Sequence, residues 1–340
     1  MKQSLTKRST LAEIAAKAGV SIPTVSRVLH NRPDVAPVTR QRVEQVIKES
    51  GFIHSRAKQA VQKGGIVDML VPGLDTLYSV EIVRGVEEVL ARTEFRLGLA
   101  ASHDSLQLQQ SWMNKVFNGS TRGAILVLAY GQRQHFDILR RHNIPFVVVD
   151  HRGELGADIP SVGATNWFGA RTAIEYLLLL GHRRIAMITG PSTHGCSVDR
   201  VAGYRFALEK AGLPVNPAFI RPGAFRHEAG YEQTCALLDL PEPPTAIFAG
   251  CDGQAMGVYS ALRARGLDIP RDVSVVGFDD IPLSSIVTPT LTTVRQPLVE
   301  MGRVATNMLL RLIAGEPLDS MRVELTTNLV ERDSCAPPVG

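Results

Sequence analysis

The sequence lacks several patterns on which large classes of proteins depend. Its 340 residues contain only four cysteines, Cys196, Cys235, Cys251 and Cys335, which lie far apart and form no Cys-x-x-Cys pair. Such spacing matches neither a zinc site nor a disulfide framework, and it suits a reducing cytoplasm. No run of ~18 uncharged apolar residues occurs, so we expect no membrane-spanning helix. No apolar segment follows the basic residues 1–8, so we expect no secretory signal.

The signatures of common enzymes are missing as well. There is no Gly-x-Gly-x-x-Gly after the first expected strand, no Gly-x-Ser-x-Gly and no Walker loop. The pair His227-Glu228 lacks the second histidine of a zinc-protease helix, because Tyr231 stands in its place. The nine histidines show no metal-ligand spacing. We therefore expect no catalytic residues, no metal and no cofactor.

Charge is divided unevenly along the chain. The whole sequence has 37 Lys or Arg and 33 Asp or Glu, a formal charge of +4. Residues 1–63 hold twelve of the basic side chains and only four acidic ones, so they carry +8 while residues 64–340 carry −4. A basic end on a mildly acidic body indicates a nucleic-acid-binding segment, whose phosphate contacts would make binding steeply salt-dependent.

Residues 10–29 have the pattern of two short helices joined by a tight turn. Thr10 and Glu13 fit a capping box at the start of the first helix. Gly19 suits the left-handed conformation that ends a helix, and Ser21 is placed to cap the second one, with Pro23 near its start. The side chains expected to face inward are Leu11, Ile14, Ala15, Ala18, Val25, Val28 and Leu29.

These two helices predict a helix-turn-helix unit whose second helix enters the major groove of DNA. A small helical hairpin without a partner has the same pattern, but the local charge argues against that interpretation. After turn-forming residues 30–34, a third helix is expected over about 39–50, with Val43, Val46 and Ile47 facing inward and Gly51 ending it. Residues 52–65 are polar and basic, as in a linker.

From Ile66 onward, short apolar runs alternate with longer amphipathic segments. Runs that are apolar throughout, such as 124–128, indicate parallel strands covered on both faces. The alternation predicts a doubly wound α/β fold in two lobes, separated near 158–163, with a ligand cleft between them. The expected strands are 66–71, 95–100, 123–128, 146–150, 185–189, 246–249, 273–278 and 291–294. The expected helices are 80–92, 106–118, 133–142, 167–180, 198–211, 228–238, 253–265 and 298–314.

Motifs spread over nearly the whole chain combine into one signature. They are residues 18–21, 24–29, 39–43 and 51–52 of the head, and 181–185, 189–191, 200–204, 275–280 and 291–297 of the body. Together they resemble the lactose/galactose repressor (LacI/GalR) family of bacterial transcription factors. Residues 76–85 and 161–167 are similar to members that regulate uptake of plant-polysaccharide sugars and respond to xylose or xylo-oligosaccharides.

The resemblance implies a small all-α helix-turn-helix head and a two-lobed, periplasmic-binding-protein-like body of doubly wound parallel sheets. It also implies a homodimer on a pseudo-palindromic operator. Some members add a C-terminal heptad helix that makes tetramers, which residues 331–340 cannot form, so a dimer is expected. The implied boundaries are 1–53 for the head, 54–65 for the hinge and 66–340 for the body, with lobe 1 at about 66–163 and 294–319 and lobe 2 at about 164–293 and 320–335.

The same resemblance nominates the residues that contact DNA. Ile22, Pro23 and Arg27 would point toward base edges, and Arg27 would bond bidentately to a guanine. Ile22 and Pro23 offer only apolar contacts, and Pro23 also suits plain helix initiation. Ser21, Thr24 and Ser26 would contact phosphate and set the register. The implied set also includes Thr10, Asn31 and Val61.

The linker departs from the family pattern. Family members carry Pro and Asn where this chain has His54 and Ser55, and a leucine that wedges into the minor groove where Val61 stands. Valine is shorter and β-branched, which weakens both the wedge and the helix that presents it. A hinge helix and a flexible tether are both compatible with this segment.

For the effector cleft, the resemblance implies polar groups for sugar hydroxyls and aromatic rings for an apolar sugar face. Each position also has a structural interpretation: Asp279 fits a cap after a strand, Trp167 fits a core, and Arg200 fits an ion pair. Cys251 stands where the family shows asparagine, which removes one polar contact. The nominated residues are Ser79, Glu81, Asn166, Trp167, Arg200, Phe225, Asp252 and Asp279.

These features together predict a cytoplasmic, sugar-responsive repressor of carbohydrate uptake or catabolism genes. Effector binding would release it from its operator, and a corepressor-dependent regulator is the alternative within the family. A sugar-binding protein without a transcriptional role shares the two-lobed body, but the basic head and the expected lack of a secretory signal argue against it.

Overall fold

The computed structural model describes residues 11–29, 35–50, 64–103, 105–118, 120–130, 133–152 and 155–339. The chain divides into two compact units, Met1–Lys63 and Gly64–Gly340. Within the described parts of both units, no helix is long and apolar enough to cross a membrane.

The N-terminal unit contains the three expected helices: α1 (Leu11–Ala18), α2 (Ile22–Leu29) and α3 (Pro37–Ser50). Gly19 has a φ of +64° and ends α1, as its lack of a Cβ predicts. The backbone N–H of Thr24 donates to Ser21 Oγ at 3.3 Å, so Ser21 caps α2. The core of this unit is made of the buried side chains Ile14, Ala15, Ala18, Val25, Val28, Val35 and Val43.

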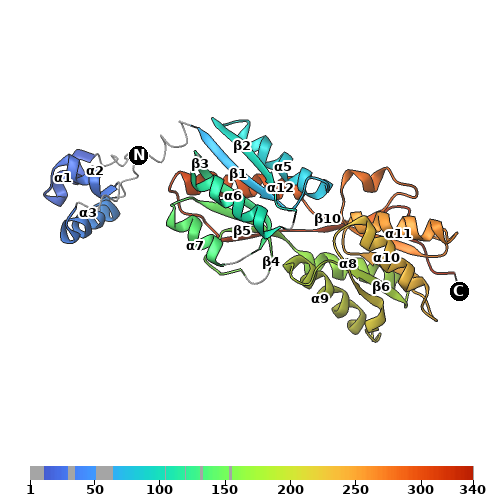
Figure 1. The fold of residues 1–340 in the computed structure, drawn as a ribbon. Coiled ribbons are helices and arrows are strands. Elements are labelled where there is room, and N and C mark those ends of the chain that lie inside the picture. The colour runs from blue at the N-terminus through green and yellow to red at the C-terminus, as the bar shows by residue number, and fades with distance from the viewer. Residues whose placement is uncertain are drawn as a thin grey trace, which may run out of the picture. The chain divides into compact units, whose positions relative to one another are not determined.

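Lobe 1 of the larger unit is built on a six-stranded sheet with the order β11-β5-β4-β3-β1-β2 (Figure 1). One face packs against α5 and α12, and the other packs against α6 and α7. The strands are β1 (Gly65–Val71), β2 (Phe95–Ala101), β3 (Thr121–Tyr130), β4 (Phe146–Arg152), β5 (Ser161–Ala164) and β11 (Arg322–Leu325). The helices are α5 (Leu77–Leu90), α6 (Leu106–Asn118), α7 (Arg133–Arg141) and α12 (Leu298–Ile313).

Lobe 2 repeats this plan on a sheet with the order β12-β10-β9-β8-β6-β7. Helices α8 and α9 cover one face, and α10 and α11 cover the other. The strands are β6 (Ile185–Thr189), β7 (Ile220–Pro222), β8 (Ala246–Ala249), β9 (Ser274–Asp279), β10 (Thr292–Arg295) and β12 (Asn328–Val330). The helices are α8 (Asn166–Leu179), α9 (Gly195–Lys210), α10 (His227–Leu238) and α11 (Asp252–Ala264), with short 3-10 turns η1 (Pro217–Phe219) and η2 (Pro282–Ser285).

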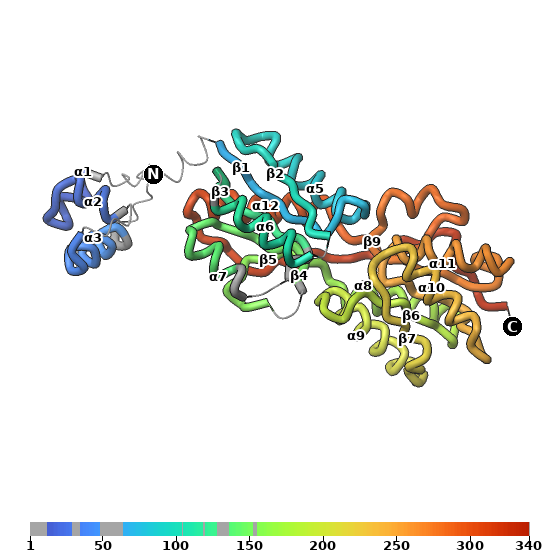
Figure 2. Tube along the Cα trace, viewed as in Figure 1, coloured from blue at the N-terminus to red at the C-terminus, as the bar shows by residue number. Residues whose placement is uncertain are grey.

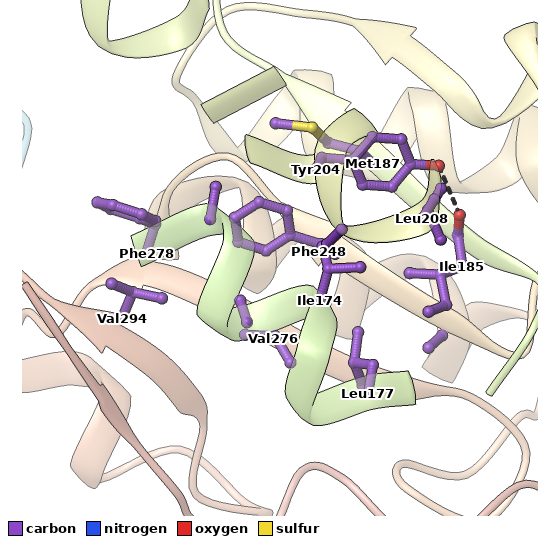
Figure 3. Packing of buried hydrophobic residues seen from close by; sticks show 14 residues of the cluster. Ile174, Leu177, Ile185, Met187, Tyr204, Leu208, Phe248, Val276, Phe278 and Val294 are labelled. Atoms are coloured by element: carbon purple, nitrogen blue, oxygen red, sulfur yellow. Dashed lines mark hydrogen bonds between the residues drawn. The ribbon is translucent and has the colours of Figure 1, made fainter. Parts of the chain in front are cut away.

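The apolar core under α8 and α9 covers one face of the sheet of lobe 2 (Figure 3), and a second apolar core under α10 and α11 covers the other face. Tyr204, Phe248 and Phe278 are among its largest fully buried side chains. The Tyr204 hydroxyl donates to Ile185 O at 2.8 Å, so this buried polar group has a hydrogen-bond partner. Because the strands leave no face open, ligands can approach this sheet only at the strand ends.

The chain passes three times between the two lobes (Figure 2). The passages lie at Thr165 after β5, at 296–297 before α12, and at 326–327 between β11 and β12. The backbone N–H of Thr327 donates to Thr165 Oγ1 at 2.9 Å, and Thr327 Oγ1 donates to Thr165 O at 3.1 Å. Two of the three connecting segments are therefore tied to each other.

Strand β11 corrects one predicted lobe boundary. The sequence places 320–335 in lobe 2, whereas Arg322–Leu325 pairs parallel with β5 in the sheet of lobe 1. Only β12 joins the second sheet, antiparallel to β10. The apolar pattern of the sequence indicates no strands at β5, β7, β11 and β12. These strands have three or four residues each, too short for a distinct apolar pattern, so backbone pairing decides their place.

Candidate functional site

A cleft of about 610 Å³ lies between the two lobes of the larger unit. Its lobe 1 wall comes from the segment after β1, the start of α5 and the end of β4. Its lobe 2 wall comes from segments after β6, β7, β8 and β9 and from the N-terminal parts of α9, α10 and α11. These are carboxyl ends of parallel strands, where ligands of open α/β sheets bind.

Arg200 on α9 is the buried cation of the cleft, with an exposed fraction of only 3%. Its Cζ lies 3.6 Å from the ring centroid of Phe278 and 5.7 Å from that of Phe225. Its Nε donates to Asn166 Oδ1 at 2.8 Å, and one terminal nitrogen donates to Gly250 O. The guanidinium is thus held by aromatic faces and hydrogen bonds in one orientation, with its remaining nitrogen toward the cleft carboxylates.

Asp279, the last residue of β9, is one of these carboxylates. It is 6% exposed, and its Oδ1 lies 3.8 Å from an Arg200 terminal nitrogen. The same oxygen accepts a hydrogen bond of 2.7 Å from Gln296 Nε2, on the passage between the lobes. Burial raises the pKa of Asp279, while the nearby Arg200 opposes this shift and the Asp252 carboxylate adds to it.

Asp150 provides a second buried carboxylate from the opposite lobe. It lies near the end of β4 with a left-handed φ of 45°, and it is 5% exposed. The Tyr78 hydroxyl donates to its Oδ2 at 2.6 Å. Burial raises the pKa of Asp150, and the Tyr78 hydrogen bond and the Arg200 charge lower it in part. Arg200 therefore lies within ion-pair distance of Asp279 in lobe 2, and its charge also lowers the pKa of Asp150 in lobe 1.

Phe225 covers the lobe 2 side of the cleft next to Arg200. Its ring lies against Gly190, where an added Cβ would stand 2.0 Å from Phe225 Cζ, so any larger residue there would displace the ring. The segment that carries Phe225 is fixed by Gln254, whose Nε2 donates to Thr189 O at 2.9 Å and to Ala224 O at 2.8 Å. Gln254 is thus a positioning residue for this wall.

Three of the eight nominated effector residues line the cleft: Arg200, Phe225 and Asp279. Asn166 lies behind Arg200, and its Nδ2 donates to Ala164 O at 3.0 Å. It orients the arginine rather than facing the cleft.

Asp252 is placed differently from its nomination. It is fully buried and accepts from the backbone N–H of Ile281 at 3.0 Å, from Ser284 Oγ at 2.7 Å and from Thr293 Oγ1 at 2.6 Å. These bonds tie the start of α11 to the segment after β9, which lines the cleft. Asp252 therefore shapes the wall from behind.

The other three nominated residues lie away from the cleft wall. Ser79 is fully buried, with its Oγ 3.3 Å from Thr76 Oγ1. Glu81 forms an ion pair of 3.0 Å with Arg84 on the same helix. Trp167 packs on the outside of α8, with ring centroids 4.9 Å from Phe168 and 5.0 Å from Phe206.

Some cleft residues are brought together only by the fold and are not among the residues nominated from the sequence; they include Tyr78, Asp150 and His194. Asp150 carried a usable signal, because it ends an expected strand and the carboxyl ends of strands bind ligands. Tyr78, in the first turn of α5, and His194, directly before α9, carry no comparable signal. In the described part of the chain, no group of three or more His, Cys, Asp or Glu is arranged to hold a metal ion.

The buried carboxylates predict a pH-dependent stability. Because the folded-state pKa of Asp150 is raised above its unfolded value of ~3.9, the folded state binds more protons and loses stability as pH rises through this interval. We expect the melting temperature of Asp150→Asn, taken relative to that of the original protein, to be higher at pH 8 than at pH ~4, close to the unfolded pKa of the carboxyl group. Asparagine keeps an acceptor for Tyr78 and tolerates the left-handed φ. Thermal melts at both pH values, with the exposed Glu87→Gln as control, measure this; an equal difference at both would contradict it.

The head offers a second candidate site on α2. Ile22 is 48% exposed, and Pro23 and Arg27 are exposed with it, whereas Val25 and Val28 are buried. The nominated base-contacting side chains therefore lie outside the core of the head, as entry into a groove requires. Thr10, Asn31 and Val61, with the hinge positions His54 and Ser55, lie outside the described residues.

Sequence profiles match both units of the chain. Residues 10–55 match bacterial regulatory proteins of the lacI family, and residues 174–335 match the periplasmic binding protein-like domain.

Individual proteins are similar over nearly the whole length. The catabolite control protein A of Priestia megaterium is 32% identical over 331 residues, which cover 96% of this chain and 98% of that protein. A solved complex of the transcriptional regulator CelR with cellobiose has 31% identity and a TM-score of 0.74, covering 96% of this chain and 100% of that one. A lac repressor dimer bound to operator and the anti-inducer ONPF has 26% identity and a TM-score of 0.71, covering 97% and 100%.

Proposed function

The chain belongs to the lacI family of bacterial regulatory proteins, which are DNA-binding transcriptional regulators and not enzymes. We propose that it is a repressor that a sugar, bound in the interlobe cleft, releases from its operator. Of its relatives, CelR is solved with cellobiose and the lac repressor on its operator. The xylose-type effector predicted from the sequence belongs to the same chemical class.

The observation that carries this proposal is the arrangement around Arg200. Sugar hydroxyls both donate and accept hydrogen bonds, so one hydroxyl can donate to Asp150 and another to Asp279 while either accepts from the guanidinium. Phe225 offers a flat apolar surface for the carbon face of a sugar ring. Donor, acceptors and ring surface thus converge on one buried position, which suits a polyhydroxy ligand.

A ligand at this position would contact both lobes and so affect their arrangement. Asp150 belongs to lobe 1 and Arg200 to lobe 2, so a sugar bound to both favours the lobe arrangement in which they are close. Gln296, on a passage between the lobes, is bonded to Asp279. The effector shifts DNA binding only by its different affinity for two lobe arrangements. We propose that the preferred arrangement is incompatible with the operator-bound dimer.

We further propose that the protein acts as a homodimer in the cytoplasm, where its DNA partner is found. A solved relative, the lac repressor, is a dimer bound to its operator. Each chain would then place one α2 in a half-site of a pseudo-palindromic operator.

Two linked measurements test the proposal. Thermal melts of the whole protein with pentoses, hexoses and short oligosaccharides should reveal at least one sugar that raises the melting temperature. Fluorescence anisotropy on a duplex selected from a random pool should show two chains per duplex and at least about tenfold weaker binding with that sugar. If no sugar raised the melting temperature, the effector class would be wrong. If the sugar strengthened operator binding, the protein would act with a corepressor.

A further inference from the structure

The cleft changes in chemistry with depth. Its most buried lining residues include Arg200, Asp150 and Asp279, which are all at most 6% exposed. This floor is polar and can saturate the hydroxyls of one sugar ring. A single sugar ring bound to this floor would leave the outer part of the cleft, nearer to solvent, unfilled.

The next layer of the wall is mainly apolar. Phe225, Met256 and Leu283 are partly buried cleft residues, and the cleft residue Ile281 lies two residues before Leu283 on the same segment. They come from three separate segments of lobe 2, and Leu77 faces the cleft from lobe 1. Apolar side chains at this depth suit the carbon faces of a ligand that extends outward from the floor.

This apolar layer is held in place from behind by the first turn of α11. Gln254 bonds the segment before Phe225, and Asp252 bonds the backbone of Ile281 and the side chain of Ser284. Both side chains are fully buried. Two buried polar residues therefore fix loops whose exposed sides are apolar, so the layer is a preformed part of the wall.

The outer rim is polar again. Asp75, Arg226, His227 and Glu228 line the cleft and are exposed. Of the two guanidinium groups in the lining, Arg226 is exposed at the rim, and Arg200 already donates to Asn166 and Gly250. The floor therefore offers few donors to a phosphorylated or carboxylated ligand, whose charge would lie beside the buried carboxyl groups of Asp150 and Asp279.

We infer that the effector is an uncharged oligosaccharide of at least two sugar rings. The first ring binds the floor around Arg200, the second passes between Leu77, Met256 and Leu283, and its outer hydroxyls reach the charged rim. The inference rests on the proposed function and narrows it to one substrate class. A monosaccharide would leave the apolar layer without a partner, and a sugar phosphate would add negative charge next to the carboxylates.

Matched sugar pairs test this inference on the whole protein. We expect titration calorimetry with xylose and xylobiose, and with glucose, cellobiose and maltose, to find a disaccharide that binds at least about tenfold more tightly than its monosaccharide. Glucose 6-phosphate should bind more weakly than glucose. A monosaccharide that binds as tightly as its disaccharides, or a sugar phosphate that binds more tightly than the neutral sugar, would overturn the inference and leave the proposed function standing. Binding of none of the neutral sugars would instead overturn the proposed function.

A substitution in the apolar layer locates the second ring. Met256→Trp fills the space beside Leu283 and should weaken disaccharide binding at least about tenfold, while monosaccharide binding changes less than about threefold. Met256→Leu, of similar volume, should keep both affinities. Melts without ligand establish that both variants are folded, and Leu283→Trp replaces Met256→Trp if that variant is not. Unchanged disaccharide binding in a folded tryptophan variant would place the second ring elsewhere and overturn the inference.

Discussion

Replacing Arg200 by methionine is expected to abolish the response to the effector while operator binding persists. The side chain is 3% exposed, and methionine is similar in length but offers no donor to a sugar hydroxyl, to Asn166 or to Gly250. A hydrogen bond to a charged group contributes ~1.5–3 kcal/mol, so loss of the bond from the remaining guanidinium nitrogen reduces effector affinity by about tenfold or more. Titration calorimetry with the sugar found by thermal melts measures the change.

The controls for this variant separate recognition from folding. Arg171→Met removes a partly exposed arginine on α8 that pairs with Glu175 at 2.9 Å outside the cleft, and it should leave effector affinity unchanged. Loss of the buried guanidinium also leaves Asp279 and Asp150 without their cation, which lowers stability at neutral pH. Arg200→Lys keeps the charge but not the planar donors, so an intermediate affinity is expected. A folded methionine variant with normal effector affinity would refute the role of Arg200.

Replacing Arg27 by alanine is expected to remove the preference for the operator while weak binding to any DNA remains. A bidentate arginine–guanine contact discriminates against the wrong base by ~1–3 kcal/mol, and the dimer makes this contact in both half-sites. Nonspecific affinity comes mainly from phosphate contacts of the basic head, which stay. Fluorescence anisotropy at fixed salt, with the operator and with a scrambled duplex of equal length, measures the specific and the nonspecific affinity.

A second charge deletion shows whether the effect is specific to α2. Lys17→Ala removes one exposed positive charge at the end of α1, so it should weaken operator and scrambled DNA by similar factors. If Arg27→Ala also weakened both equally and kept the operator preference, Arg27 would be a phosphate contact and not a base reader.

The head illustrates what a local pattern can predict. The apolar spacing of Ile14, Ala18 and Val25, the end of α1 at Gly19 and the cap at Ser21 were all readable from the sequence, and the structure confirms each. These features depend on neighbours within a few residues, so local stereochemistry decides them. Most long elements of the body were predictable for the same reason.

The cleft illustrates where the prediction stopped. Arg200 and Asp279 line it as expected, but Asp252 turns away from it and bonds the segments around Ile281 and Thr293. An aspartate after a strand has the same sequence signature whether its carboxylate faces a ligand or a neighbouring loop. Only the positions of those loops, set by distant parts of the chain, distinguish the two.

The sequence by itself determined a basic head built as a helix-turn-helix and a body of two doubly wound lobes, because charge, capping residues and hydrophobic period are local properties. Tertiary structure alone decided that 322–325 returns to lobe 1. It also decided that Tyr78 and Asp150 face Arg200 across the cleft, and that Trp167 packs outside it. The reason is physical: burial, ion pairing and the depth of a cleft are properties of surfaces that segments far apart in the sequence form together.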